Sequence, residues 1–374
     1  MKIVYCIAGT RHSGGMERVL ANKANWLAER GHEVVIITTD QNGEPPFFKL
    51  DDTIVTYDLG INYEENNGKS FLNKLLNYPA KQWSHYRRLS KLLKHLKADV
   101  VVSMFCNDAS FIHRIKDGSR KILEIHFSRF KRLQYGRRGL WGVADKLRSR
   151  RDLTTASKFD KFVVLTKEDS HNWKGLGNLV VIPNARTFEV AEPARLKNKT
   201  VIAVGRLCYQ KGFDRLIAVW EKVVDQLPEW TLKIIGAGED EDNLRRLLND
   251  KGLEENVIIH SAQSDDMPEI YKDASIYVMT SRYEGLPMAL LEAQAAGLPI
   301  VSFDCKCGPK DIVTDGEDGY LVNEGDIDTM AQRLIRLMTD EDLRIEMGAN
   351  AFRNSDRFSE SVVMQQWLDL FNNV

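Results

Sequence analysis

The sequence lacks long hydrophobic runs, which argues against membrane spans and against an export signal. Near the N-terminus, in MKIVYCIAGT, six apolar residues follow Lys2 before Gly9 interrupts them. This stretch is too short for the apolar core of a signal peptide and far too short to cross a bilayer. It predicts a first buried strand, and the expected location of the protein is the cytoplasm.

The sequence also lacks the cysteine pattern of a disulfide framework or of a structural zinc site. Its five cysteines, an odd number, are scattered at Cys6, Cys106, Cys208, Cys305 and Cys307. Without an export signal these residues are expected to be reduced thiols. One residue separates the last two cysteines, but no second Cys or His pair has the spacing of a closed zinc site.

Low-complexity tracts and short repeats are absent as well. The composition, 43% hydrophobic and 28% charged, excludes a disordered chain, and the length of 374 residues favours two domains. The net charge of −1 conceals an asymmetry, because residues 1–190 carry 32 Lys and Arg against 20 Asp and Glu, whereas residues 191–374 carry 20 against 33. The two halves thus have charges of +12 and −13. This separation predicts an anionic surface or partner for the first half.

Strand-like and helix-like patterns alternate along both halves of the chain. Short runs rich in Val and Ile predict strands at 2–8, 33–38, 53–58, 99–105, 120–126, 160–165 and 178–182, and then at 200–205, 231–236, 256–260, 275–280, 299–303 and 319–322. Helical patterns between them include 16–30, 85–97, 212–227, 240–251, 266–273, 287–297 and 326–338. Continuous apolar strands that alternate with helices indicate parallel sheets covered on both faces.

The alternating pattern restarts near residue 198, after a stretch whose prolines and charges suit a linker. The fold class that we expect is therefore α/β, with two Rossmann-like, doubly wound domains that face a cleft. The first domain is expected to span residues 1–187 and the second residues 188–357. An apolar helical pattern near the C-terminus predicts a last helix, within 358–374, that returns to the first domain.

Two glycine-containing loops follow predicted strands, at the strand ends where open α/β sheets bind ligands. Gly14 and Gly15 follow the first strand, and paired glycines let backbone amides approach a diphosphate, although a simple tight turn would also explain them. The second loop, GRLCYQKG at 205–212, places Arg206 and Lys211 five residues apart between two glycines. These two cations can clamp a diphosphate. Taken alone, they are equally compatible with two solvated surface cations.

A third glycine-containing loop, IIGAGEDEDN at 234–243, is expected to be structural. Four consecutive acidic residues crowd the start of the following helix. They favour the helix dipole there but would repel phosphate. We therefore assign this loop no part in binding a nucleotide.

Two carboxylates flank a Gly-Leu-Pro turn in SRYEGLPMALLEA, Glu284 before the turn and Glu292 in the helix that follows. Pro287 suits the first helical position, so Glu292 is expected about two turns into the segment. Its charge lies in an apolar run, where burial without a partner is costly. A carboxylate accepts two hydrogen bonds from a vicinal diol such as that of a ribose, so we expect a ribose to be the missing partner. Free amides at the helix start would take the phosphate between the two carboxylates.

These motifs together resemble a known family. The stretch EGLPMALLEA is similar to the Glu-x7-Glu motif of retaining glycosyltransferases of the GT-B fold, specifically glycosyltransferase family 4. The Gly14-Gly15 pair, the loop 205–212 and the stretch GLPIVSFD at 297–304 occur in the order and spacing of that family. The resemblance covers nearly the whole chain and is strongest from about residue 200 to residue 322.

The resemblance implies roles for individual residues. It implies that Glu292 holds the ribose of the donor, and that Arg206 and Lys211 neutralise the diphosphate. It also implies that Glu284 and nearby backbone amides hold the hydroxyls of the donor sugar, and that Gly285, Leu286 and Pro287 belong to the substrate-binding stretch. The implied reaction is a front-face attack in which the leaving phosphate helps to deprotonate the acceptor. Cations then replace a divalent ion, so neither a metal nor another cofactor is expected.

Three polar residues of the first half also follow predicted strands. His126, in KILEIHFS, can hydrogen-bond to the donor sugar or the acceptor, and the family often has a histidine at a similar place. The alternative is a histidine that is satisfied within the core. Asn107 and Asp108 follow the strand at 99–105 and are further candidates for contact with the acceptor.

The segment 126–153 is strongly basic, with nine Lys and Arg against two acidic residues and with interleaved aromatic and leucine side chains. It predicts either an amphipathic surface on an anionic inner membrane, next to a lipid-linked acceptor, or a solvated helical face. Because no nucleic-acid-binding module is present, a nucleic-acid partner is not expected.

The function that we expect is the transfer of a hexosyl group from a nucleotide sugar, such as a UDP-hexose, to a glycan or lipid-linked acceptor of a surface polysaccharide. Glu284, His126, Arg206 and Lys211 are the candidate catalytic residues. Backbone atoms at Gln263–Ser264, before the helix at 266–273, can serve several different bases, so the base follows from the resemblance alone. One alternative is a nucleotide-sugar epimerase of the same architecture, which needs carboxylate and histidine groups close together. Another is a non-catalytic protein that binds glycans or lipids.

Overall fold

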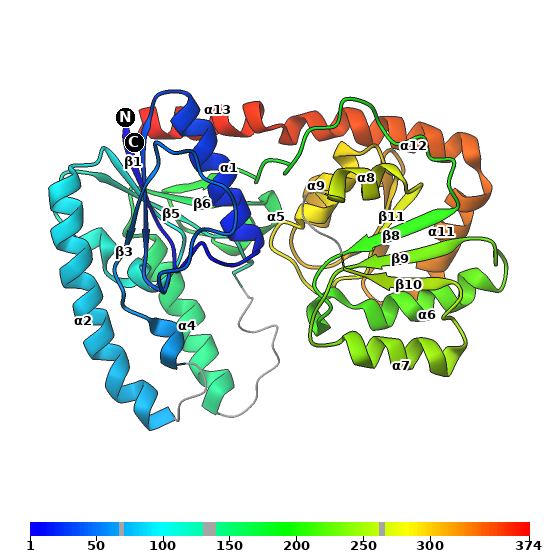
Figure 1. The fold of residues 1–374 in the computed structure, drawn as a ribbon, viewed down its shortest axis with the longest axis horizontal. Coiled ribbons are helices and arrows are strands. Elements are labelled where there is room, and N and C mark those ends of the chain that lie inside the picture. The colour runs from blue at the N-terminus through cyan, green and yellow to red at the C-terminus, as the bar shows by residue number, and fades with distance from the viewer. Residues whose placement is uncertain (67–70, 130–139, 262–265) are drawn as a thin grey trace. The chain divides into compact units, whose positions relative to one another are not determined.

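The chain forms two compact units in a computed structural model that describes residues 1–66, 71–129, 140–261 and 266–374. Unit 1 comprises Met1–Ile182 and Met364–Val374, and unit 2 comprises Pro183–Val363. Each unit is built on a parallel sheet with helices packed against it (Figure 1). The predicted fold class of two Rossmann-like domains is therefore confirmed, and so is the return of the last helix to the first domain.

Unit 1 contains a seven-stranded sheet with the strand order β3-β2-β1-β4-β5-β6-β7. Its strands are β1 (Lys2–Cys6), β2 (Glu33–Thr38), β3 (Val55–Asp58), β4 (Val100–Ser103), β5 (Arg120–Glu124), β6 (Lys161–Val164) and β7 (Leu179–Val181). Its helices are α1 (Gly15–Glu29), α2 (Phe71–Leu96), α4 (Leu140–Ala156), α5 (Lys167–Asn172) and most of α13 (Glu360–Asn372). All strand pairs are parallel.

Unit 2 contains a six-stranded parallel sheet with the order β10-β9-β8-β11-β12-β13. Its strands are β8 (Thr200–Val204), β9 (Thr231–Ile235), β10 (Val257–His260), β11 (Ile276–Met279), β12 (Ile300–Asp304) and β13 (Gly319–Asn323). Its helices are α6 (Phe213–Val224), α7 (Glu241–Lys251), α8 (Met267–Lys272), α9 (Met288–Ala295), α10 (Pro309–Ile312), α11 (Ile327–Thr339) and α12 (Glu341–Asn354).

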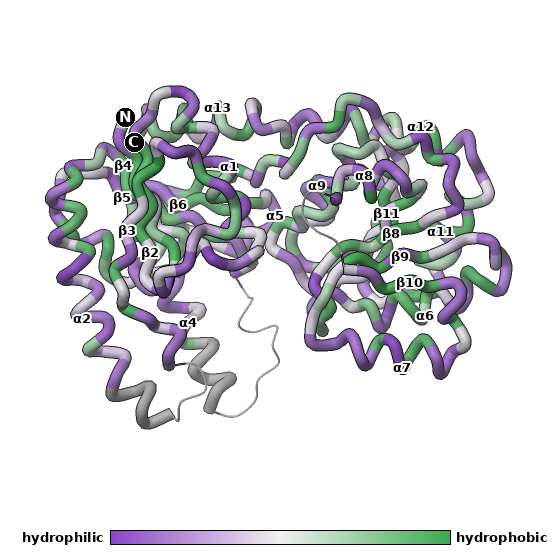
Figure 2. Tube along the Cα trace, viewed as in Figure 1, coloured by the Kyte–Doolittle hydropathy of each residue, from purple (hydrophilic) through white to green (hydrophobic). Residues whose placement is uncertain are grey.

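The apolar strands that defined the sequence pattern form the cores. The four residues of β4, for example, are all buried, as are those of β11. Figure 2 shows the strands of both sheets as largely hydrophobic, whereas α7 alternates between hydrophilic and hydrophobic residues. Burial on both faces explains why these strands are continuous apolar runs and do not alternate. None of the helices among the described residues is both long enough and apolar enough to cross a membrane.

The strand order reverses once in each sheet, between β1 and β4 in unit 1 and between β8 and β11 in unit 2. At such a point the loops leave the carboxyl ends of adjacent strands in opposite directions, and open α/β sheets bind ligands there. Gly14 lies in the loop after β1. Arg206 and Glu284 lie in the loops after β8 and β11. The topology therefore places these candidate residues at the switch points of their sheets.

Candidate active site

The loop at 205–212 is held tightly against the end of β11. A Cβ atom on Gly212, which has a φ of +68°, would lie 2.3 Å from the carbonyl oxygen of Thr280. A Cβ atom on Gly205 would lie 2.9 Å from Cε of Lys211. A side chain does not fit at Gly212, where the contact is with backbone, and the φ of +158° at Gly205 disfavours any other residue there. The loop consequently carries Lys211 next to the chain that follows β11.

Lys211 and Glu284 form an ion pair, with Lys211 Nζ 2.8 Å from Glu284 Oε1. The carboxylate is also bound by Gln210, whose amide donates to Glu284 Oε2 over 3.3 Å and to the carbonyl oxygen of Tyr283 over 3.0 Å. Glu284 is 7% exposed. Two motifs separated by more than 70 residues thus meet at one contact. From the sequence, Lys211 was expected to bind the diphosphate of the donor and Glu284 the hydroxyls of its sugar. No motif pointed to Gln210.

The other cation of this loop, Arg206, is exposed, and no hydrogen bond or ion pair of its side chain occurs within the described part of the chain. Arg282 instead supports the loop. It binds Asp214 through both oxygens and lies with its guanidinium 4.0 Å from the centre of the Tyr209 ring. Burial raises the pKa of Asp214, but the hydrogen bonds and the charge of Arg282 outweigh burial, so the pKa is lowered. Arg206 therefore remains available to an anionic ligand.

Glu292 is buried and has two hydroxyl partners within unit 2. Thr187 Oγ1 donates to Glu292 Oε1 over 2.6 Å, and the hydroxyl of Tyr271 donates to Oε2 over 2.8 Å. The inference that a protein partner for this carboxylate is missing is therefore wrong. Each carboxylate oxygen has a second lone pair, so the group can still accept hydrogen bonds from a diol. Thr187 lies in the linker and Tyr271 in α8, and no motif in the sequence pointed to either.

The turn before α9 differs slightly from the prediction. Pro287 is the residue that caps the helix, and the first helical residue is Met288, so the expected first helical position for Pro287 is wrong by one residue. The loop after β12 packs closely here, because a Cβ atom on Gly308 would lie 2.4 Å from Cδ of Pro287. No side chain caps this helix, so its first backbone amides are not occupied by a capping group.

The glycines of the loop at 234–243 have a packing explanation. A Cβ atom on Gly236 would lie 1.9 Å from the carbonyl oxygen of Gly205, and one on Gly238 would lie 2.2 Å from that of Leu207. The first turn of α7 is acidic, and Glu241 pairs with Arg245 at 2.8 Å. These glycines therefore allow two loops to touch, as the structural interpretation of this stretch requires.

Gly14 and Gly15 lie at the N-terminus of α1, where Gly14 is the capping residue and no side chain caps the helix. Neither glycine has a positive φ. A Cβ atom on Gly15 would have no atom of the described residues within 4 Å. A Cβ atom on Gly14 would lie 2.1 Å from Oε2 of Glu17, so local packing at the helix start accounts for that glycine, as the simple tight turn requires.

His126 follows β5 in unit 1, and its side chain is 7% exposed. Its Nε2 lies 3.0 Å from Glu124 Oε1. The same carboxylate oxygen is 2.6 Å from Nζ of Lys23. Glu17, in the first turn of α1, is close enough to interact with His126, and burial raises the pKa of its carboxyl group.

Asp108, which follows β4, is another buried acid at the carboxyl end of this sheet. It is 2% exposed, and its Oδ2 has no hydrogen-bond partner among the described residues. Burial raises its pKa to about 6. Its neighbour Asn107 is partly exposed and accepts a hydrogen bond from the hydroxyl of Tyr78 over 3.4 Å.

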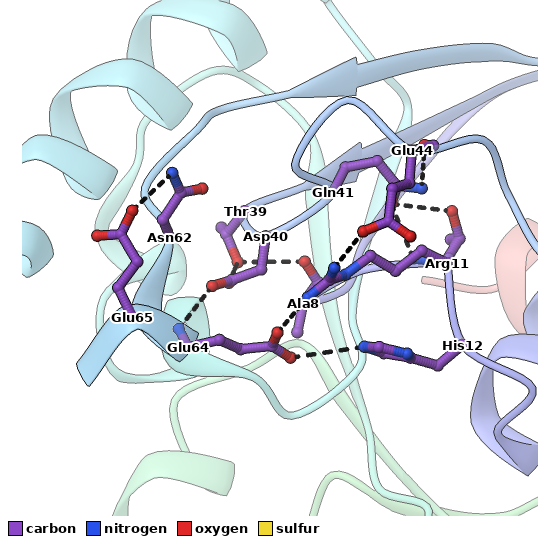
Figure 3. Close-up of polar contacts among 11 residues, drawn as sticks. Ala8, Arg11, His12, Thr39, Asp40, Gln41, Glu44, Asn62, Glu64 and Glu65 are labelled. Atoms are coloured by element: carbon purple, nitrogen blue, oxygen red, sulfur yellow. Dashed lines mark hydrogen bonds and ion pairs between the residues drawn. The ribbon is translucent and has the colours of Figure 1, made fainter. Parts of the chain in front are cut away.

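A polar cluster at the ends of β1 and β2 was not identified from the sequence. Figure 3 shows Arg11 reaching two carboxylates, those of Glu44 and Glu64, while the other oxygen of Glu64 faces His12. Asp40 accepts a hydrogen bond from the backbone amide of Glu64 over 2.8 Å and thereby joins the loop after β2 to the segment after β3. The side chains of this polar cluster offer several hydrogen-bond acceptors for hydroxyl groups.

Part of the basic surface of unit 1 lies outside the described residues. This part comprises residues 130–139, with Arg137 and Arg138. In unit 2, Gln263 and Ser264 also lie outside the described residues. A second basic surface lies on α2, which contains six Lys and Arg and no acidic residue. On this helix Trp83 is 62% exposed, and the guanidinium of Arg87 lies 4.6 Å from the centre of its ring. Among the described residues, no group of three or more His, Cys, Asp or Glu could hold a metal ion.

Comparison with known proteins agrees with this geometry. The family model described as "Glycosyl transferases group 1" matches residues 185–354, and that described as "Glycosyltransferase Family 4" matches residues 13–187. An uncharacterized glycosyltransferase of Haemophilus influenzae is 32% identical over 98% of both chains. The amylovoran biosynthesis glycosyltransferase AmsD of Erwinia amylovora is 29% identical over 99% of both. A mutant of S. aureus TarM, solved with fondaparinux, α-GlcNAc-glycerol and UDP, has a TM-score of 0.79 at 19% identity over 99% of both chains.

Proposed function

Since the chain is a glycosyltransferase of family 4 with the GT-B fold, we propose that it transfers a hexosyl group from a UDP-hexose to a glycan or lipid-linked acceptor, with retention of the anomeric configuration. The observation that carries the proposal is the meeting of the two motifs of unit 2, with Lys211 2.8 Å from Glu284 and Glu292 in the following helix. The relatives named above support a role in surface-glycan synthesis and a UDP-linked donor.

The arrangement of unit 2 suggests how a nucleotide sugar would lie. Glu292 would accept the ribose hydroxyls while Thr187 and Tyr271 hold its carboxylate in place. The uncapped N-terminus of α9, together with the free cation of Arg206, would meet the diphosphate. Glu284 would accept hydroxyls of the sugar, and its pairing with Lys211 would keep its carboxylate oriented.

The transfer itself requires stabilisation of the leaving group. As the bond to the anomeric carbon breaks, negative charge grows on the diphosphate, and Arg206 and Lys211 would neutralise it without a metal ion. In this proposal the departing phosphate accepts the proton of the acceptor hydroxyl, which attacks from the same face. Preorganised cations and amides of this kind are typically worth about 10²–10³ in turnover for each group.

The acceptor would be bound by unit 1. The polar cluster of Arg11, Glu44 and Glu64 would provide partners for the hydroxyls of a glycan, and Gly15 has open space beside it among the described residues. The exposed Trp83 and the cations of α2 provide a surface for contact with an anionic membrane, where a lipid-linked acceptor would be found.

The experiment that tests this function combines binding with product analysis. A thermal-shift screen of UDP-, GDP- and ADP-sugars identifies the donor, because a tight ligand raises the melting temperature by mass action. The product made with that donor is then examined by NMR for its anomeric configuration. An inverted product would exclude the retaining mechanism. Conversion of the UDP-sugar to its epimer without any acceptor would support the epimerase alternative instead.

A further inference from the structure

Unit 1 contains a buried ion pair that the proposed function does not use. Lys23, in the middle of α1, is 4% exposed, and Glu124, at the end of β5, is fully buried. Lys23 Nζ lies 2.6 Å from Glu124 Oε1. Removing two charges from water is costly, and apolar side chains of similar volume often give the same or greater stability. Stability alone is therefore a poor explanation for this pair.

The surroundings of the pair favour the ionised form of Glu124. Lys23 Nζ lies 3.7 Å from the centre of the Trp367 ring, which α13 supplies, and 5.9 Å from that of Tyr5. Burial lowers the pKa of Lys23, and Glu124 opposes that effect. Burial alone would raise the pKa of Glu124, but Lys23 and His126 lower it to about 2. The carboxylate is consequently ionised at neutral pH although no solvent reaches it.

The ionised carboxylate faces the histidine of the site. Glu124 Oε1 lies 3.0 Å from Nε2 of His126 in an ion-pair contact that does not meet hydrogen-bond geometry, and the same oxygen accepts the hydrogen bond from Lys23. The other oxygen, Oε2, has no hydrogen-bond partner among the described residues. One carboxylate oxygen is thus shared between a buried cation and the imidazole.

We propose that Lys23 and Glu124 are positioning residues of the transferase, which hold the imidazole of His126 in one orientation and one tautomer. The proposal rests on the proposed function and on the expectation from the sequence that His126 contacts the donor sugar or the acceptor. A carboxylate beside Nε2 favours a proton on that nitrogen, so the neutral ring presents Nδ1 as a hydrogen-bond acceptor. Lys23 keeps the carboxylate ionised for this purpose. Trp367 covers the cation, so the last helix takes part in the arrangement.

The first test is spectroscopic and does not depend on activity. The ring nitrogens of His126 are observed by ¹H–¹⁵N NMR of the full chain at neutral pH and assigned by their loss in His126→Asn. The wild type is expected to show a protonated Nε2 and an unprotonated Nδ1. In Glu124→Gln and in Lys23→Met this preference is expected to disappear. Should Glu124→Gln not fold, Glu124→Asp, which keeps the charge but shortens the side chain, serves in its place.

A matched control exists on the same strand. Lys121 lies at the other end of β5 and forms a second buried ion pair, with Asp117, at 2.5 Å. The side chains of this pair are 6% and 1% exposed, close to the 5% and 1% of Lys23 and Glu124. Asp117→Asn is expected to lower the melting temperature but to leave the ring nitrogens of His126 and kcat unchanged.

The second test is a double-mutant cycle in transferase turnover. Glu124→Gln is expected to lower kcat about tenfold, within the range for coupled neighbouring groups, with donor KM changed less than about threefold. In a His126→Ala background the same substitution is expected to have no further effect on kcat. A merely structural Glu124 would lower kcat by the same factor in both backgrounds.

The outcomes separate this inference from the proposed function. If the wild type transfers sugar, but the cycle is additive and the ring nitrogens are unchanged in Glu124→Gln, the positioning role is refuted while the function stands. If no nucleotide sugar serves as a donor, the proposed function fails. The spectra then still decide whether the buried pair sets the tautomer of His126.

Discussion

Replacement of Glu284 by glutamine is expected to strengthen the binding of free UDP. In the structure, the carboxylate holds Lys211 at 2.8 Å, so a diphosphate that needs this cation must compete with it. Glutamine keeps the size of the side chain, removes the competition and also removes a negative charge near the phosphates. A hydrogen bond to a charged group is worth about 1.5–3 kcal/mol.

The magnitude follows from the exposure of the pair. The side chain of Lys211 is 21% exposed, so solvent screens the interaction in part, and we expect a gain of about 1 kcal/mol. This corresponds to a Kd for UDP that is about fivefold lower, measured by isothermal titration calorimetry. Turnover of the intact donor should fall at the same time, by about 10–100-fold, because the sugar hydroxyls lose a charged acceptor.

The control is Glu221→Gln, which breaks an ion pair between α6 and α7 at 2.6 Å and should leave the affinity for UDP unchanged. The reasoning would be refuted if Glu284→Gln bound UDP more weakly than the wild type by threefold or more. That result would place Glu284 in direct contact with the nucleotide rather than with the sugar.

Five further outcomes are expected. Glu292→Gln should weaken UDP binding about tenfold or more, because the ribose loses a charged acceptor worth about 1.5–3 kcal/mol; an unchanged Kd in calorimetry would contradict the ribose assignment. Lys211→Ala should lower kcat about 10²–10³-fold with a smaller effect on donor KM, since the charge that it meets is larger in the transition state. The wild type should keep its activity in excess EDTA, and loss of activity that Mn²⁺ restores would contradict the metal-independent mechanism. Asp108→Asn should raise the melting temperature more at pH 8 than at pH 5. The folded pKa of about 6 exceeds the ordinary 3.8, so the wild type loses stability, on the order of 3 kcal/mol, as pH rises from about 4 through 6; an equal gain at both pH values would argue against it. The double substitution of Arg87 and Lys91 by glutamate should reduce sedimentation with anionic vesicles at low salt, and equal sedimentation with neutral vesicles would show that α2 does not recognise lipid charge.

The strands could be predicted from the sequence because their signal is local. Most are short apolar runs buried on both faces, the edge strands β3 and β10 being exceptions, and every predicted strand is present. The start of α2 could not be predicted in this way. The helix begins at Phe71 and contains Pro79, whereas the pattern indicated a helix only from residue 85, because a proline usually marks a break. Helix α12 was missed because only a few of its residues are buried.

In unit 2, the location of the candidate site residues could be predicted from the sequence, but their hydrogen-bond and ion-pair partners could not. Glycine-flanked cations and paired carboxylates are visible in the sequence, and the topology places them at the ends of adjacent strands. That Lys211 would pair with Glu284 depends on the path of two loops across 73 positions. Thr187 and Tyr271 gave no signal because a hydroxyl in a linker and a tyrosine in a short helix are common features of any domain.

The return of the last helix has a consequence for the order of folding during translation. Residues 364–374 belong to unit 1, yet the ribosome makes them only after the whole of unit 2. Until then the nascent first domain lacks the Trp367 ring over Lys23, and the apolar surface that α13 will cover is open to solvent. Domains generally fold in the order of their synthesis. Here the first domain to emerge is the last to be completed, so chaperones have the longest access to it.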